Sequence, residues 1–445
     1  MSVREGSLEA PTRHPIDWQS SDFYDTAKLH AEMERVFDIC HGCRRCVNLC
    51  TAFPTLFDLV DESATGEVDA VAKARYGDVV DQCYLCDMCY MSKCPYVPPH
   101  PWNVDFPHLM LRAKAQKYKQ DGAKLRDRLL SSTDAVGRLA AIPVVAQAVN
   151  AANGNGVVRS FMDSAIGIHR ERVLPPYSAR KFRAGAQSAG AHALRDGERT
   201  RGKVAVYATC YINYNEPGIG HDLLALLEHN EIPYVLAEKE VCCGMPKLEL
   251  GDLDSVARLK SVNIPPLARL AREGFAILAA VPSCTLMFKK ELPLMFPEDA
   301  DVAAVSRAMC DPFEYFVMRN KDGLLKTDFK RGLGRISYHM PCHSRVQNIG
   351  QKTREALQLV PDTTVHTVER CSGHDGTWGV KSEFYENSMK IGRPVFRQMA
   401  EGDPDYISSD CAIAARHIEQ GMSEAGPLRA EKQHPLSLLR IAYGI

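Results

Sequence analysis

Two runs of four closely spaced cysteines constrain the fold of this chain more than any other feature. They read Cys40-x2-Cys43-x2-Cys46-x3-Cys50 and Cys83-x2-Cys86-x2-Cys89-x4-Cys94-Pro95. A [4Fe–4S] cube presents four irons, and each iron binds one thiolate. Three cysteines at successive intervals of three residues let one loop hold three corners of such a cube. The spacing therefore predicts two [4Fe–4S] clusters in a helical, ferredoxin-like module.

The fourth corner of each cube is expected to come from the other run. One cluster would then use Cys40, Cys43, Cys46 and Cys94. The other cluster would use Cys83, Cys86, Cys89 and Cys50. The interval before Cys94 is one residue longer than usual, and Thr51 stands where a proline often follows the fourth cysteine. Because the fourth cysteine reaches across to the other cube, one additional residue is tolerable.

Structural zinc and disulfide bonds are the alternative uses of these cysteines. Zinc sites usually consist of separated CxxC pairs with four ligands per ion, and the two runs do not follow that pattern. The first six residues lack the apolar core of a secretory signal, which favours a reducing cytosol for the sixteen cysteines. We therefore expect a cytoplasmic protein, and a position at the inner face of a membrane stays open.

The bulk composition limits the possible partners. The formal net charge is −1, so the chain has no overall basicity that would favour nucleic acid. No apolar run reaches the roughly 18–20 residues of a membrane-spanning helix. The longest one, residues 139–149, is interrupted by Pro143. It indicates a buried helix or a surface that docks a partner or a membrane, and burial or partner docking is favoured.

The chain divides into five predicted parts. Residues 1–30 form a polar N-terminal arm, 31–125 the ferredoxin-like domain, 126–200 a helical segment and linker, and 201–330 and 331–445 two similar α/β domains. The last two parts are predicted because short apolar segments alternate with helical ones beyond residue 200, which favours parallel sheets covered by helices. Three predicted strands that each lead to a cysteine occur in the first of these domains, and the same order returns in the second. Internal duplication is the simplest explanation.

Cysteines that follow parallel strands are expected to meet, because ligands bind at the carboxyl ends of such strands. In the first domain these cysteines are Cys210, Cys242, Cys243 and Cys284. In the second domain they are Cys342, Cys371 and Cys411. We therefore expect one or two further iron–sulfur clusters here, and inert buried cysteines are the alternative.

The second domain is one thiol short of a full ligand set. An imidazole suits iron, and His374 is the preferred fourth ligand among His343, His374 and His417. Ser372, which replaces the second cysteine of the pair, is a weaker candidate. An iron with an open position could instead bind a substrate, and His343, His374, Arg345 and Asp410 would then handle protons or anions.

Several of these segments resemble the heterodisulfide reductase-like iron–sulfur family with Cys-Cys-Gly (CCG) domains, which includes one of the subunits of anaerobic glycerol-3-phosphate dehydrogenase. They are Val241-Cys242-Cys243-Gly244-Met245-Pro246, Tyr338-His339-Met340-Pro341-Cys342-His343 and Gly392-Arg393-Pro394-Val395-Phe396-Arg397-Gln398. The resemblance extends from about residue 35 to the end of the chain. It departs from the full motif at Met287, Ser372 and Ala414, where the family has cysteines. These departures disfavour the family's non-cubane clusters and favour simpler ones.

The resemblance implies an electron-transfer subunit of an oxidoreductase, without catalysis of its own. It would relay electrons between a partner redox protein, either a flavoprotein dehydrogenase or a di-iron protein, and a quinone at the membrane surface or another acceptor. No GxGxxG fingerprint follows an early strand, so a flavin would belong to the partner. The alternative is a catalytic reductase that uses an incompletely ligated C-terminal cluster on a disulfide or a small molecule. An iron–sulfur sensor is disfavoured because no DNA-binding or basic element is present.

Overall fold

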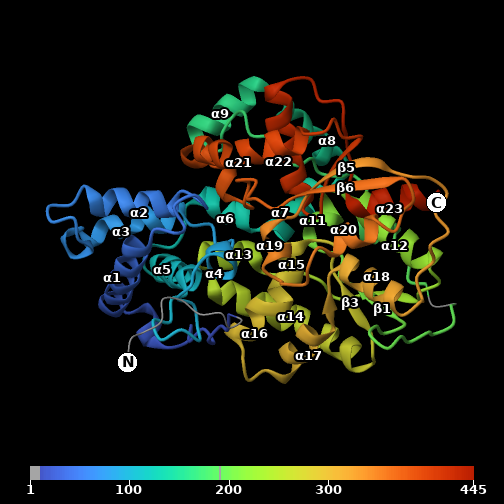
Figure 1. Ribbon diagram of the computed structural model, residues 1–445, viewed down its shortest axis with the longest axis horizontal. Coiled ribbons are helices and arrows are strands. Elements are labelled where there is room, and N and C mark those ends of the chain that lie inside the picture. Colours follow the sequence, from blue (N-terminus) through green and yellow to red (C-terminus); the bar gives the residue numbers. More distant parts are fainter. Residues whose placement is uncertain (1–10, 190–191) are drawn as a thin grey trace. The chain divides into compact units, whose positions relative to one another are not determined.

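The computed structural model describes residues 11–189 and 192–445, so residues 1–10 of the predicted arm lie outside it. The chain forms two compact units. The first contains the residues up to Ser131, together with Pro246–Val256 and Leu294–Phe296, and the second contains the remainder. Figure 1 labels the helices and strands in chain order.

The first unit is helical around the two cysteine runs. Its helices are α1 (Thr26–Cys43), α2 (Ala52–Asp61), α3 (Tyr76–Gln82), α4 (Met88–Ser92), α5 (Phe106–Asp121) and α6 (Leu125–Ser131). Helix α1 starts at an Asp25 cap that accepts the Lys28 N–H at 2.7 Å. Phe53 and Phe106 pack with ring centroids 4.7 Å apart in a core shared by α1, α2, α3 and α5. This core supports the loops that carry the cysteines.

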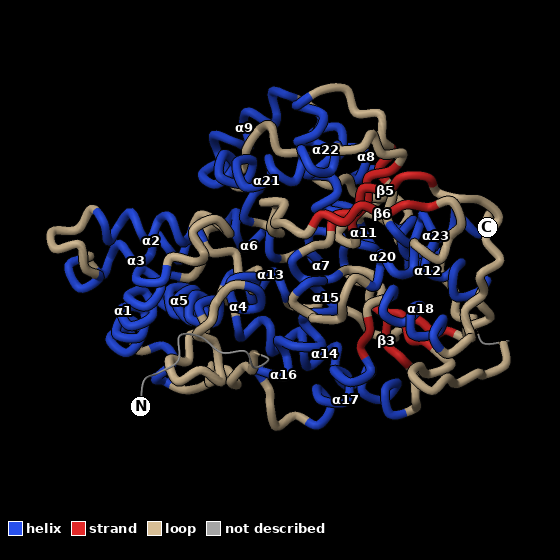
Figure 2. The backbone as a smooth tube through the Cα atoms, in the orientation of Figure 1, coloured by secondary structure: helices blue, strands red, loops and turns tan. Residues whose placement is uncertain are grey.

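The second unit contains two parallel sheets of four strands each, grouped in two places in Figure 2. The first sheet consists of β1 (Val204–Val206), β2 (Tyr234–Leu236), β3 (Ala276–Leu278) and β4 (Met309–Cys310). The second consists of β5 (Gly334–His339), β6 (Thr363–Val368), β7 (Tyr406–Ser409) and β8 (Glu431–Lys432). The strand orders are β2-β1-β3-β4 and β6-β5-β7-β8, and every pair is parallel. The predicted duplication of a parallel α/β domain is therefore confirmed.

Helices cover both sheets and fill the segment that precedes them. They are α7 (Thr133–Ala140), α8 (Pro143–Gly154), α9 (Gly156–Ile166), α10 (Phe182–Gly185), α11 (Cys210–Tyr214), α12 (Pro217–His229), α13 (Met245–Leu250), α14 (Leu253–Arg272), α15 (Pro282–Leu286), α16 (Leu292–Met295), α17 (Ala300–Ala308), α18 (Pro312–Lys321), α19 (Cys342–Arg345), α20 (Lys352–Leu357), α21 (Tyr385–Ala400), α22 (Ala412–Ala425) and α23 (Pro435–Tyr443). Helices α13, α14 and α16 include residues assigned to both units.

The two α/β domains share one apolar core. Buried side chains of both sheets, such as Val206 and Leu278 from the first and Ile336 and Val365 from the second, belong to a single cluster. Helix α12 of the first domain packs against α23 of the second. There the Arg440 guanidinium binds the Asp222 carboxylate at 2.7 Å.

The apolar run at residues 139–149 is only partly buried. Ala140, Ala141 and Ala146 are buried, whereas the side chains of Leu139 and Val144 are 67% and 77% exposed. The expectation of a buried helix is therefore wrong for one face of this segment. No single helix of the described residues has the length and apolar composition to cross a membrane, and the bent pair α7 and α8, with 105° between them, meets these criteria jointly.

The start of α23 depends on an uncharged histidine. The His434 Nδ1 accepts the Leu436 N–H at 3.2 Å, and its Nε2 donates to the Asp410 carbonyl at 3.2 Å. The surrounding protein takes the imidazole out of water and lowers the pKa of His434 to about 4. A proton on Nδ1 would remove the acceptor that caps the helix.

Stability should consequently fall with acid in a way that His434 controls. Unfolded histidine takes up a proton below about pH 6.5, so this contribution is complete above that pH and is lost as the pH falls toward 4. Between pH 7 and pH 5, the unfolding free energy of the wild type should drop about 2 kcal/mol more than that of His434→Asn, which keeps a capping side chain. Urea unfolding at both pH values measures the two changes in free energy. An equal drop in the wild type and in His434→Asn would contradict the role given to His434.

Candidate metal centres

The two cysteine runs of the first unit lie at helix ends and in tight turns. Helix α1 ends at Cys43, α2 starts just after Cys50, and α4 contains Cys89. Left-handed backbone at the non-glycine residues Arg44, Leu85 and Asp87 bends the chain between the cysteines. Such conformations are costly for residues with a side chain and concentrate at functional sites. The chain therefore wraps closely around the thiols.

The thiols of the two runs lie close to one another, and Cys46 is near Cys89 as well as near Cys40. Burial raises the pKa of Cys40, and the nearby thiols of Cys94, Cys46 and Cys43 raise it further. Burial likewise raises the pKa of Cys89, with contributions from Cys86, Cys83, Cys46 and Cys50. Backbone N–H groups of Tyr96 and Val97 point at the Cys94 sulfur and favour its thiolate. The structure thus brings each run together with the last cysteine of the other, and the ligand assignment stays a prediction.

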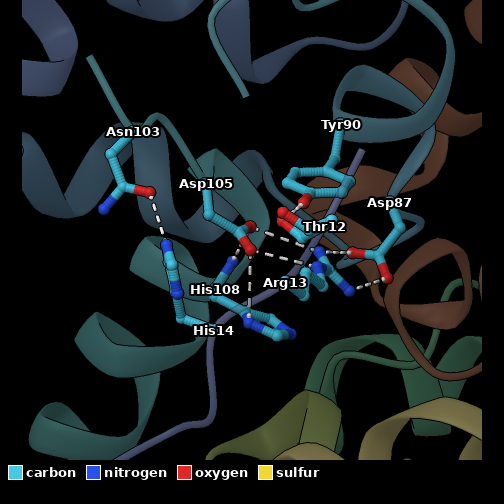
Figure 3. Close-up of polar contacts among 8 residues, drawn as sticks. All are labelled: Thr12, Arg13, His14, Asp87, Tyr90, Asn103, Asp105 and His108. Atoms are coloured by element: carbon cyan, nitrogen blue, oxygen red, sulfur yellow. Dashed lines mark hydrogen bonds and ion pairs between the residues drawn. The ribbon is translucent and has the colours of Figure 1, made fainter. Parts of the chain in front are cut away.

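The N-terminal arm fastens the second run. Arg13 binds the carboxylate of Asp87, which lies between Cys86 and Cys89, through two N–H groups at 2.7 and 2.9 Å. The same guanidinium donates to Asp105 at 3.0 Å, and its carbon lies 4.5 Å from the Tyr90 ring centroid. Figure 3 shows Arg13 between the two carboxylates, with the Tyr90 hydroxyl donating to the Thr12 carbonyl. These contacts hold the turn that carries the cysteines.

Four cysteines meet at the ends of the strands of the first sheet, and we call this group the first strand-end site. Cys210 begins α11 after β1, Cys242 and Cys243 follow β2, and Cys284 lies in α15 after β3. Hydrogen bonds between the thiols connect Cys210 with Cys242, Cys242 with Cys243, and Cys243 with Cys284. Hydrogen bonds from the thiols of Cys210 and Cys243 lower the pKa of Cys242.

Helix α7 and helix α14 complete the first strand-end site. The Cys242 N–H donates to the Asp134 carboxylate. The buried Thr133 hydroxyl has no well-formed hydrogen bond and lies beside the thiols of Cys210 and Cys242. Asn263, which is 1% exposed, accepts the Val241 N–H at 3.0 Å and donates to the Cys242 carbonyl at 3.0 Å. These isolated polar residues carry no sequence signal, and sequence reasoning missed all three.

Three cysteines take the equivalent positions in the second sheet and form the second strand-end site. Cys342 begins α19 after β5, Cys371 follows β6, and Cys411 caps α22 after β7. The Gly373 N–H lies 3.3 Å from the Cys371 sulfur. Burial raises the pKa of Cys411 to about 11, while the N–H groups of Ile413 and Ala414 lower it. Backbone donors therefore favour thiolates here as well.

Two buried histidines lie beside the second strand-end site. The His374 and His417 rings are 5.7 Å apart, edge to face. Burial lowers the pKa of His374 to about 3, so its imidazole is neutral, as a metal ligand requires. Of the other predicted candidates, Ser372 is buried next to Cys371. Arg345 lies 3.6 Å from Glu369 and Asp410 binds the hydroxyls of Tyr338 and Thr353, so both have structural partners.

The two strand-end sites adjoin each other. The Ser283 hydroxyl, next to Cys284, lies 2.7 Å from Nδ1 of His343, which follows Cys342. Helices α15 and α19, which carry these residues, are in contact. His343 is thus placed between the two strand-end sites.

The donor chemistry fits iron–sulfur clusters. Cysteines gather in groups of four or three, backbone N–H groups point at several sulfurs, and the Thr133 hydroxyl is left without a good partner beside two of them. Among the described residues, no three His, Cys, Asp or Glu side chains are arranged to hold a single metal ion. A cube has a different requirement, because each thiolate binds a different iron and the ligands are spread around the cluster.

Comparison with known proteins gives matches to both halves of the second unit. The cysteine-rich CCG domain model matches residues 204–289 and 336–417. One subunit of the anaerobic glycerol-3-phosphate dehydrogenase of Escherichia coli K12, the one designated C, is 30% identical over 344 residues, which cover 76% of this chain and 82% of that protein.

Two more distant relatives cover about half of the chain. One subunit of the CoM/CoB fumarate reductase of Methanothermobacter marburgensis, the one designated B, is 25% identical over 252 residues, 56% of this chain and 48% of the relative. An uncharacterized iron–sulfur protein of Methanocaldococcus jannaschii is 26% identical over 222 residues, 49% of this chain and 42% of the relative.

Proposed function

Because the chain belongs to the family of iron–sulfur subunits with two CCG domains that includes its relative from anaerobic glycerol-3-phosphate dehydrogenase, we propose that it relays electrons between a partner redox protein and a quinone. The observation that supports this proposal is the position of the cysteines: eight lie in the two runs of the first unit, and seven lie at the strand ends of the two sheets, which adjoin through Ser283 and His343. Bound [4Fe–4S] clusters would supply one-electron transfer. The partner would be a flavoprotein dehydrogenase or a di-iron protein.

The residues of the first unit would bind two clusters with different surroundings. Cys40, Cys43, Cys46 and Cys94 would hold one, and Cys83, Cys86, Cys89 and Cys50 the other. The ion pair between Arg13 and Asp87 would fix the loop that carries Cys83, Cys86 and Cys89. In the second unit, the first strand-end site offers four thiols, and the second offers three thiols with His374 as the proposed fourth ligand.

An exposed apolar face supports an acceptor in a membrane. It consists of the exposed side chains Leu139, Ile142, Val144, Val145, Val157, Val158, Phe161 and Ile166 of α7 to α9 and the α7–α8 turn. Helix α8 contains no charged residue over its twelve positions. The opposite face of α7 carries Thr133 and Asp134 at the first strand-end site. We therefore propose that this face lies on a lipid bilayer and brings the site toward a dissolved quinone.

Quinone-loaded vesicles test the relay. Anaerobically purified protein reduced with dithionite should show EPR signals, and phospholipid vesicles that contain a quinone should abolish them. Two one-electron steps and two protons from water convert each quinone to a quinol. Vesicles without quinone should leave the signals unchanged.

Charges on the apolar face should uncouple the protein from the vesicles. The double variant Val144→Glu and Phe161→Glu should bind vesicles more weakly, because each new carboxylate would lose its water on contact with the bilayer. Reoxidation of the reduced protein by the vesicles should slow at least tenfold. Val262→Glu, at a 40% exposed apolar residue of α14, is the matched control. Iron-poor wild-type protein would refute the relay, whereas unaltered binding of the double variant would refute only the membrane contact.

A further inference from the structure

Arg172 is a buried cation that has no ion-pair partner in the described part of the chain. It is 2% exposed, and its hydrogen-bond partners are two neutral groups, Nδ1 of His417 and the Ser388 hydroxyl at 2.6 Å. Its guanidinium carbon lies 4.9 Å from the Tyr385 ring centroid. Among the described residues no carboxylate is within ion-pair distance of it, and Glu424 acts on it only from farther away. Burial of an unpaired charge is strongly unfavourable.

The fold holds this cation in place. The guanidinium of Arg159, itself buried, donates to the carbonyls of His169 and Arg172 at 2.6 and 2.7 Å and to that of Arg170 at 3.2 Å. The His169 ring stacks on Tyr385 at 3.7 Å. The loop at residues 169–172 is therefore fastened along its length, and Arg172 has little freedom to turn toward solvent.

Arg172 faces the second strand-end site. Its partner His417 lies on α22, which starts after Cys411, and its partner Ser388 has its carbonyl against Gly373, two residues after Cys371. The charge of Arg172 also contributes to the lowered pKa of His374. The loop at residues 169–172 lies outside both ranges that match the CCG domain.

Two buried donors of this cluster have no well-aligned acceptor. Since an Arg172 N–H donates to Nδ1 of His417, the proton of that imidazole resides on Nε2. Nε2 of His417 has no well-formed hydrogen bond, although the Ser372 carbonyl is near, and Nε of Arg172 has none either. Unsatisfied buried donors are rare and call for an acceptor. A protonated Nε2 also makes His417 a hydrogen-bond donor rather than a ligand of iron.

We propose that Arg172 is a positioning residue that supplies the counter-charge for an anionic iron–sulfur centre at Cys342, Cys371 and Cys411. The inference depends on the proposed function, because it requires a cluster at the second strand-end site. Net charge and hydrogen bonding around a cluster set its reduction potential. A fixed positive charge favours the form that has gained an electron, so Arg172 raises the potential of this centre above that of an otherwise equal site.

Redox titration of the full-length holoprotein tests this role. In Arg172→Gln the EPR signal of the second strand-end site, assigned by its loss in Cys342→Ser, should shift to lower potential. At a fixed solution potential the ratio of reduced to oxidised centre should fall at least tenfold, which corresponds to a shift in reduction potential of about 59 mV for one electron. Arg172→Lys keeps the charge and should shift it less. Arg170→Gln removes an exposed arginine of the same loop and should shift nothing.

Each result supports or overturns the proposal. A shift confined to the second strand-end signal supports it. An unchanged potential with full iron content, or loss of iron from the first unit as well, would overturn it, the latter because it shows a general structural role. Unchanged iron content in both Cys342→Ser and Cys411→Ser would show that the second strand-end site holds no iron and would refute this inference. EPR signals from the first unit would then still be consistent with the proposed electron relay.

Discussion

Replacing Cys50 with serine should remove the cluster that Cys83, Cys86 and Cys89 hold, although Cys50 is close in sequence to the other run. The structure supports this expectation, because Cys50 is among the thiols that raise the pKa of Cys89. Cys94→Ser should instead remove the cluster of Cys40, Cys43 and Cys46. Each variant should lose about four irons per chain. Iron and sulfide analysis of anaerobically purified protein, with EPR, measures the loss.

Cys310→Ser is the matched control for this exchange. Of the sixteen cysteines, Cys310 is the one outside the two runs and the two strand-end sites. It lies in β4 and has Glu314, Lys289 and Asp311 as its charged neighbours rather than other thiols. Its replacement should leave the iron content unchanged. If Cys50→Ser and Cys94→Ser both abolished the EPR signal of the run in which they stand and spared the other, the crossed assignment would be wrong.

Replacing Gly373 with alanine should destabilise the second α/β domain and deplete its site of iron. Gly373 has φ = +77°, which is costly for any residue with a side chain, and a Cβ there would overlap the Ser388 carbonyl oxygen. The two effects together should lower the unfolding free energy by about 2–5 kcal/mol. The N–H of the same residue points at the Cys371 sulfur, so a shifted backbone also removes a donor from the ligand. Denaturant unfolding and iron analysis measure both consequences.

Gly402→Ala separates the two causes. Gly402 has φ = +78° and nothing within 4 Å of an added Cβ, so its replacement measures the conformational cost alone. That cost should be about 1–2 kcal/mol, without loss of iron. Equal destabilisation by the two variants would show that the Ser388 carbonyl yields to the new methyl group.

The sequence predicted the parts of this protein that repeat a short pattern. Cysteine spacing assigned Cys50 and Cys94 to opposite clusters, and this assignment stays a prediction, because Cys46 and Cys50 both lie near Cys89. Apolar segments that lead to cysteines identified three strands of the first sheet, because buried parallel strands are short apolar runs. The return of the same order identified three strands of the second sheet, whose residues are more polar. Strands β4 and β8 were missed, since each has only two residues.

Residues that act from outside the motifs could not be predicted. Thr133, Asp134 and Arg172 reach the strand-end sites from a segment that the sequence indicated as helix and linker. The periodicity of this segment does not show that one face of α7 lies on the first strand-end site. The contact between Asp134 and Cys242 forms only when folding brings together residues 108 positions apart. For residues 139–149 the sequence left burial and a docking surface open, because an apolar side chain such as that of Val144 does not show whether a neighbour covers it.

The common core beneath the two sheets limits how this protein can be divided. Side chains from both copies belong to it, and α12 of one copy lies on α23 of the other. A fragment that ended near residue 330 would expose to water the apolar surface that its twin now covers. Repetition of the motif therefore did not yield two autonomous modules, because each half covers apolar surface of the other.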